Sequence, residues 1–258
     1  MTNYRKTSLD QIFLSNWRWK PFFNIIYNSL LPLELNSYNI PSQFLNREIL
    51  LGAENNTYKV STETWACRTS KIKQARAACL TAGEKISVLN FVITPLNIFD
   101  LPFFGADLVT LPSGHLIALD LQPALKNDYK HTRKVWDKLL PLHRKWQSLL
   151  PFGGPLPPEA EPFFSPGFLW TRLPLGKEGD EIISEIISPA FIDYLSLYLD
   201  LLFNAIEVNN ERSLTILDGQ KKYMKYRADK DPAKSMLTKF YGKEWTSNYI
   251  NQVLFDLQ

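Results

Sequence analysis

The stretch from Asn90 to Pro123, NFVITPLNIFDLPFFGADLVTLPSGHLIALDLQP, constrains the fold more than any other part of this chain. In and just before it, apolar and β-branched residues bounded by turn signals predict three strands, Lys85–Ile93, Ala106–Leu111 and His115–Leu121. The tight turn Pro112-Ser113-Gly114 joins the last two strands, which makes that pair antiparallel. We therefore expect an antiparallel sheet at the centre of the fold.

Asp107 interrupts the second of these strands, in the segment FFGADLVTL. A carboxylate buried in its ionised form among such neighbours costs several kcal/mol, so it either reaches water or tends to hold a proton. The first alternative is an acid on an edge strand that points to solvent. The second alternative is a buried carboxyl group that holds a proton, and such a group can act as a general acid. The residues by themselves leave both alternatives open.

Helices are predicted on both sides of this sheet in the sequence, which gives an α+β pattern. The predicted helices are Ser8–Leu30 with an interruption near Pro21, Tyr129–Leu150, Glu181–Val208 with a start or kink at Pro189, Glu211–Asp229 and Ser247–Phe255. Asn56–Cys67 and Phe168–Leu173 are predicted as further strands, and the type of Thr69–Ala82 is left open. We expect three layers with the sheet in the middle, in a single domain over residues 1–258.

Composition and motifs exclude several classes of protein. A net charge of +3 gives no argument for nucleic-acid binding, and no apolar run approaches the roughly 20 residues of a membrane span. The N-terminus lacks the apolar core of a secretory signal, so a cytoplasmic protein is expected. Cys67 and Cys79 form no CxxC motif. The sequence has no GxGxxG, GxxxxGK[ST], GxSxG or HExxH motif.

Four other polar residues are candidates for a site. Asn90 either satisfies neighbouring backbone in its strand or contacts a ligand. Asp120 is expected to cap the loop that follows its strand. Arg172 suits a carboxylate ligand, with an ion pair to a helix acid as an equal alternative. Asp231 is expected to cap the helix that follows it.

The three histidines give no metal site. His115 follows the Pro-Ser-Gly turn and is expected to be exposed at the hairpin end. His131 and His143 lie on a basic predicted helix and are expected to be solvated.

Four segments, taken in order, resemble the ferredoxin-dependent bilin reductases: DLPFFGADLV, HLIALDLQP, FFSPGFLWTRLPLG and YRADKDPAKSMLTKFYGKEW. The similarity extends from about Trp65 to the C-terminus. It implies a three-layer α/β/α sandwich whose central sheet is antiparallel, with a linear bilin between the sheet and the C-terminal helices. It also implies no bound metal or flavin. Reduced ferredoxin supplies single electrons from its own 2Fe-2S cluster, the substrate becomes a radical, and protein acids supply protons.

The resemblance also implies roles for particular residues. Asp107 and Asp231 match two family aspartates that flank the bilin from opposite faces and are implicated in proton donation, and Arg172 matches an arginine that pairs with a propionate. Members that form phycocyanobilin carry a Glu and a His where this sequence has Ala78 and Asn90. A two-electron reduction is therefore expected, with Asn90 forming hydrogen bonds near the bilin without titrating.

The segments around SPGFLWTRLPLG and DPA are most similar to members that form phycoerythrobilin. They imply reduction of the A-ring diene of 15,16-dihydrobiliverdin to 3Z-phycoerythrobilin, in phycobilin biosynthesis. The alternatives are reduction of the 15,16 methine bridge of biliverdin and a non-catalytic bilin carrier. The implied partners are ferredoxin, the open-chain tetrapyrrole and the upstream reductase that forms dihydrobiliverdin. The implied compartment is the cyanobacterial cytoplasm, or the plastid stroma of an alga.

Ferredoxins are acidic, so the surface that docks one is expected to be basic. The candidates from the predicted helices are Lys126, Lys130, Arg133, Lys134 and Lys138, and Lys221, Lys222 and Lys225.

Overall fold

The computed structural model describes residues 4–6, 17–53 and 56–256, and its centre is an eight-stranded antiparallel sheet. The strand order is β10-β9-β8-β7-β6-β5-β2, with β4 also paired to β5. The strands of this sheet are β2 (Asn36–Ser37), β4 (Asn46–Leu51), β5 (Tyr58–Arg68), β6 (Ile72–Ala82), β7 (Ile86–Pro95), β8 (Phe103–Leu111), β9 (Gly114–Gln122) and β10 (Leu169–Leu173). A separate pair is formed by β1 (Tyr4–Lys6) and β3 (Asn39–Pro41).

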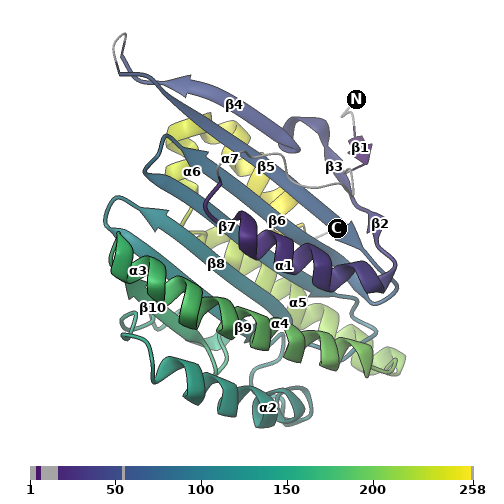
Figure 1. The fold of residues 1–258 in the computed structure, drawn as a ribbon. Helices are drawn as coiled ribbons and strands as arrows, with labels where there is room; N and C mark the ends of the chain where they lie inside the picture. The colour runs from purple at the N-terminus through teal and green to yellow at the C-terminus, as the bar shows by residue number, and fades with distance from the viewer. Residues whose placement is uncertain (1–3, 7–16, 54–55, 257–258) are drawn as a thin grey trace.

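Helices cover both faces of the sheet (Figure 1). They are α1 (Lys20–Leu30), α2 (Tyr129–Gln147), α3 (Lys177–Ile182), α4 (Ser188–Phe203), α5 (Asn210–Lys230), α6 (Lys234–Tyr241) and α7 (Lys243–Tyr249). Helices α1, α3 and α4 cross one face, and α5, α6 and α7 lie behind the other (Figure 1). This arrangement confirms the predicted α+β class, a three-layer sandwich around an antiparallel sheet.

The alternation of side chains along β8 explains why both faces need a cover. Phe104, Ala106 and Leu108 belong to the core beneath α1 and α4. Phe103 and Val109 belong to the second core, beneath the C-terminal helices. Successive residues of a strand point to opposite faces, so Asp107 shares the face of Phe103 and Val109. Because β8 lies between β7 and β9, the first alternative for Asp107, an acid on an edge strand, is excluded.

The N-terminal helix differs from its prediction. Residues 7–16 lie outside the described part of the chain, and α1 begins at Lys20 with Pro21 in its first turn. Proline is favoured there because the first N–H groups of a helix have no partner within the helix. Pro21 therefore lies in the first turn of this helix and does not interrupt it. The segment left open at Thr69–Ala82 is the strand β6.

The long predicted helix Glu181–Val208 is present as a continuous helix from Lys177 to Phe203, with a π-helical turn at Ile183–Ile187 and Pro189 in the first turn of α4. An 18-residue window in it has a mean hydropathy of 1.5, so by length and composition it could span a membrane. No such span is expected from the sequence. Phe191, Tyr194 and Tyr198 of this helix are fully buried in the core, and core helices pass the same test.

The expectations for His115 and His131 are wrong, because residues distant in the sequence cover both side chains. His115 is buried, with its ring 6.1 Å from the Trp19 ring. His131 is buried too: its Nδ1 lies 2.6 Å from Asp100 Oδ1, and its Nε2 accepts a hydrogen bond from the backbone N–H of Ala124. His143 is half-buried.

Candidate functional site

The sheet places Asp107 in a row of paired residues that crosses five strands. Asn90 pairs with Asp107 on one side and with Ala78 on the other. Ala118 pairs with Asp107 from β9, and Trp170 of β10 pairs with Ala118. Of the two positions that distinguish this sequence from the phycocyanobilin-forming pattern, Asn90 therefore lies directly beside the central aspartate and Ala78 lies one strand further along the same row, on the face toward the C-terminal helices.

A chain of side-chain hydrogen bonds connects Asp107 to the strand β6. Arg76 Nη1 donates to Asn90 Oδ1 over 2.8 Å, and Asn90 Nδ2 donates to Asp107 Oδ1. The guanidinium can only donate and a carboxylate can only accept, so these contacts fix the orientation of the amide between them. Of the two alternatives for Asn90, satisfying neighbouring backbone is therefore not what this side chain does.

The last turn of α5 brings a second cation to Asp107 from the opposite side. Arg227 is buried, and its Nη2 lies 3.8 Å from Asp107 Oδ2. Asp107 itself keeps 32% of its side-chain surface exposed. Asp107 is thus held by Asn90 within the sheet and faces Arg227 across the gap between sheet and helix.

Asp231 follows directly after α5 and lies near the same cations. Its Oδ1 accepts a hydrogen bond from the backbone N–H of Ala233 over 2.7 Å, which stabilises the turn before α6. The N-cap of α6 is Ala233 and has no side-chain hydrogen bond, so the prediction that Asp231 caps this helix is wrong. Its Oδ2 has no hydrogen-bond partner among the described residues. One oxygen is used to fix the loop, and the other is available to a ligand.

The electrostatic environment distinguishes Asp231 from an ordinary surface acid. Burial raises the pKa of its carboxyl group; Arg227 and Arg76 oppose this shift and Asp107 adds to it. Burial lowers the pKa of Arg227, but Tyr223, Asp107 and Asp231 outweigh it, so that pKa is raised. Asp231 therefore holds a proton to a higher pH than a solvated aspartate, while Arg227 stays charged.

Asp120 does not cap the loop after its strand, so that expectation is wrong. Its carboxylate accepts hydrogen bonds from the backbone N–H of Ser165, over 2.9 Å, and from the Ser165 hydroxyl. The residue is 1% exposed, and burial raises the pKa of its carboxyl group to about 7. Asp120 thus holds the proline-rich segment 151–166 against the sheet. The sequence could not show this because Ser165 is 45 residues away.

Arg172 lies on the edge strand β10, away from the two acids. It pairs with Leu116, and alternation places its side chain on the same face as Trp170 and Asp107. Its guanidinium carbon is 5.6 Å from the Trp170 ring centroid, and its side chain is exposed. Within the described part of the chain it forms no ion pair, so the alternative of a helix acid as its partner is not seen. The structure brings together Asp107, Asn90 and Asp231 and leaves Arg172 at the rim.

Neither Arg76 nor Arg227 was predicted from the sequence as a member of this cluster. A signal for Arg76 exists in the segment Gln74-Ala75-Arg76-Ala77-Ala78. Once that segment is known to be a strand, alternation puts Arg76 on the same face as Ala78. Charged residues are rarely buried on a covered sheet face unless they are paired, so this position marks Arg76 as a candidate for the site.

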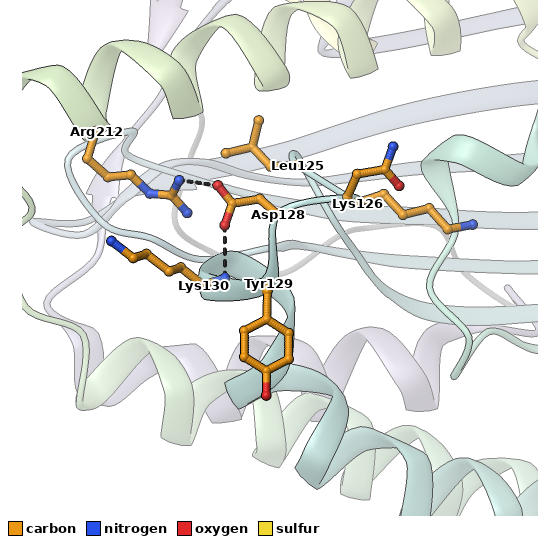
Figure 2. A pocket seen from close by; sticks show the side chains of 7 residues that line it. Leu125, Lys126, Asp128, Tyr129, Lys130 and Arg212 are labelled. Carbon is orange, nitrogen blue, oxygen red and sulfur yellow. Dashed lines mark hydrogen bonds and ion pairs between the residues drawn. The ribbon is translucent and has the colours of Figure 1, made fainter.

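A separate open hollow of about 720 Å³ lies where the loop before α2 meets the start of α5 (Figure 2). Arg212 bridges Asp128 and Asp100 beside it, and Lys126 and Lys130 line its walls. None of the predicted site residues lines this hollow. It is a basic surface feature and not the location of the acid pair.

Comparison with known proteins identifies the family of this chain. The family model described as ferredoxin-dependent bilin reductase matches residues 24–256. Phycoerythrobilin:ferredoxin oxidoreductase of Prochlorococcus marinus (strain MIT 9211) is 58% identical over 257 residues, which cover 100% of both chains. The protein of the same name from Synechococcus sp. (strain RCC307) is 56% identical over 257 residues, covering 100% of this chain and 98% of its own.

A solved structure of a bilin-binding enzyme has the same fold. The crystal structure of selenomethionine phytochromobilin synthase from tomato in complex with biliverdin superposes with a TM-score of 0.81 at 25% identity. The match covers 93% of this chain and 83% of that one. The resemblance found in the four sequence segments is confirmed: this chain belongs to the ferredoxin-dependent bilin reductases, an oxidoreductase family.

Proposed function

We propose that this protein reduces the A-ring diene of 15,16-dihydrobiliverdin to 3Z-phycoerythrobilin. Two reduced ferredoxins each give one electron and two protons are taken up, so one double bond is lost and two oxidised ferredoxins are released. The observation that carries the proposal is the pair Asp107 and Asp231, which both interact electrostatically with the buried Arg227 at the end of α5. The full-length similarity to phycoerythrobilin-forming enzymes supports the choice of reaction.

The two acids suit a reaction that needs two protons. A carboxylic acid can deliver one proton and must then be refilled, so a pair matches two successive reductions of one electron each. Asn90 and Ala118, the two neighbours of Asp107 in the row, and Ala78 beyond Asn90 are uncharged, so no third acid or imidazole adjoins Asp107 in the row. This supports a single two-electron reduction.

Product analysis tests the proposal. Biliverdin and 15,16-dihydrobiliverdin are offered separately under anaerobic conditions with photoreduced ferredoxin, and the products are identified by absorbance and chromatography. We expect phycoerythrobilin from dihydrobiliverdin and no turnover of biliverdin. Formation of 15,16-dihydrobiliverdin from biliverdin would instead assign the methine-bridge reaction.

We propose that Arg172 anchors a bilin propionate at the rim. Arg172→Gln is expected to raise the KM for the bilin by about tenfold, with a smaller change in kcat, because a charge-assisted pair at an exposed position contributes on the order of 1 kcal/mol. Steady-state kinetics at saturating ferredoxin measure this effect. Arg68→Gln, which changes an exposed arginine at the far edge of the sheet, is the matched control. Equal KM values for both variants and the wild type would contradict the anchor.

We further propose that exposed lysines of α2 and α5 steer ferredoxin docking. Lys130 and Lys134 on α2, and Lys221 and Lys225 on α5, are exposed and form no ion pair among the described residues, whereas Lys138 and Lys222 are paired with Asp200 and Asp218. Lys126 was expected to lie on a helix with these lysines, but it precedes α2.

Raising the salt concentration from about 0.05 M to 0.5 M is expected to increase the apparent KM for ferredoxin several-fold, because screening shortens the reach of these charges. The double variants Lys130→Gln/Lys134→Gln and Lys221→Gln/Lys225→Gln compare the two helices, and the KM for bilin serves as the internal control. Kinetics unchanged by salt would count against steering by charge.

A further inference from the structure

The guanidinium of Arg76 is the least satisfied charged group among the described residues of this site. Arg76 is 0% exposed, and only its Nη1 has a hydrogen-bond partner, Asn90. Its Nε and Nη2 are both buried without a partner among the described residues. Buried polar groups almost always have partners, and a buried cation without them is costly. Two aligned N–H groups of this kind point to an oxygen atom that is supplied by a ligand.

The surroundings of Arg76 place those donors inside the site. Burial lowers the pKa of the Arg76 guanidinium, whereas Tyr249, Asp231 and Asp107 raise it. Both proposed proton donors are therefore electrostatic neighbours of this cation. Neither forms an ion pair with it in the described part of the chain, because Asn90 stands between Arg76 and Asp107. The open donors are left to whatever occupies the space between the acids.

The position of Arg76 in the sheet decides which group of a bilin it meets. Arg172, the proposed propionate anchor, is on the edge strand β10, and Arg76 is four strands away on β6. At roughly 4.8 Å per strand, the two cations are separated by about 19 Å across the sheet alone. Propionates are charged and favour the exposed rim. A fully buried guanidinium instead suits a neutral oxygen of a terminal pyrrole ring, which is a lactam carbonyl.

We propose that Arg76 binds the lactam oxygen of a terminal bilin ring through Nε and Nη2. This role rests on the proposed function, because it places the conjugated system between Asp107 and Asp231. When ferredoxin transfers one electron, the neutral bilin gains one negative charge, which conjugation spreads onto the lactam oxygen. The Arg76 cation stabilises that charge until a carboxylic acid transfers a proton to the bilin and becomes a carboxylate. Asn90 then has a second role, because it couples the position of this cation to that of Asp107.

Bilin binding without ferredoxin tests the proposal independently of turnover. Absorbance titrations with biliverdin and with 15,16-dihydrobiliverdin give dissociation constants for the wild type, Arg76→Gln and Arg76→Lys. We expect Arg76→Gln to weaken binding of both bilins by about 10- to 100-fold, since two hydrogen bonds to a charged donor are lost. Arg76→Lys should recover part of the loss. A failure of the proposed regiochemistry would change the products but not these constants, because both bilins carry lactam oxygens.

Two controls separate binding from folding and lactam from propionate. Arg212→Gln removes a mostly buried cation from the network with Asp100 and Asp128, outside the site, and is expected to lower stability without changing bilin affinity. Bilin dimethyl esters, whose propionates are masked, should show the same loss of affinity with Arg76→Gln as the free acids. If the loss disappears with the esters, the lactam assignment is wrong. If both Arg76 variants bind as the wild type does and only their melting temperatures fall, Arg76 is a structural residue and the proposal is overturned.

Discussion

Replacing Asp231 with asparagine is expected to lower the turnover number by about 100- to 10,000-fold, while the bilin still binds. Asparagine has nearly the same size and can keep the hydrogen bond from the N–H of Ala233, but it has no acidic proton to transfer. Burial raises the pKa of Asp231, so this carboxyl group keeps its proton to higher pH than a solvated aspartate does. Anaerobic kinetics with reduced ferredoxin measure the loss.

The same variant should also change which species accumulates. Without the proton donor, the bilin that has received one electron has no route to the product. We therefore expect a longer-lived substrate radical, visible by electron paramagnetic resonance in samples frozen during turnover. Asp107→Asn is expected to slow a proton transfer in the same way, from the other side of the substrate.

Asp229→Asn is the matched control for this prediction. Asp229 is exposed on α5, two residues before Asp231, and forms no hydrogen bond or ion pair with a member of the cluster in the described part of the chain. Its replacement should leave turnover within about twofold of the wild type, as surface substitutions usually do. If Asp107→Asn and Asp231→Asn also retain the wild-type rate, proton donation by this pair is wrong.

The second large effect is a pH-dependent stability that comes from Asp120. Burial raises the pKa of this carboxyl group from 3.8 to about 7 in the folded protein. Between these values the folded protein holds a proton that the unfolded chain has released. The stability that this proton provides is therefore fully present below pH 4 and is lost as the pH rises through about 7. The slope is about 1.4 kcal/mol per pH unit over this window.

Urea unfolding at a series of pH values measures this contribution. The difference in free energy of unfolding between the wild type and Asp120→Asn cancels the titration of all other groups. We expect the free energy of unfolding of the wild type, minus that of Asp120→Asn, to fall by on the order of 4 kcal/mol between pH 4 and pH 7. Ser165→Ala removes a hydrogen bond that lowers the Asp120 pKa, so it should move the end of the window to higher pH. Parallel curves for the wild type and Asp120→Asn would show that Asp120 titrates normally.

The sequence determined those parts of the fold that depend on neighbours in the chain. The turn at Pro112-Ser113-Gly114 and the alternation around it gave the β8–β9 hairpin. The turn signal at Asp231-Pro232 is likewise local, because Asp231 accepts a hydrogen bond from the N–H of Ala233 two residues on. Local steric preferences and short-range hydrogen bonds decide such features, so a single chain carries the information. The order of four motifs was enough to place the chain in its family.

Only the tertiary structure decided which side chains meet. Arg76, Asn90 and Asp107 come from three strands, and Arg227 comes from a helix 120 residues further along, so no local pattern relates their side chains. His131 was expected to be solvated and Asp120 to cap the loop after its strand, but Asp100 and Ser165 from other segments are their partners and both side chains are buried. The sequence determined by itself that Asp107 is an acid in an apolar strand. The packing of α5 against the sheet decided that this acid faces a cation and a second acid, because burial and charge depend on what the fold places opposite a residue.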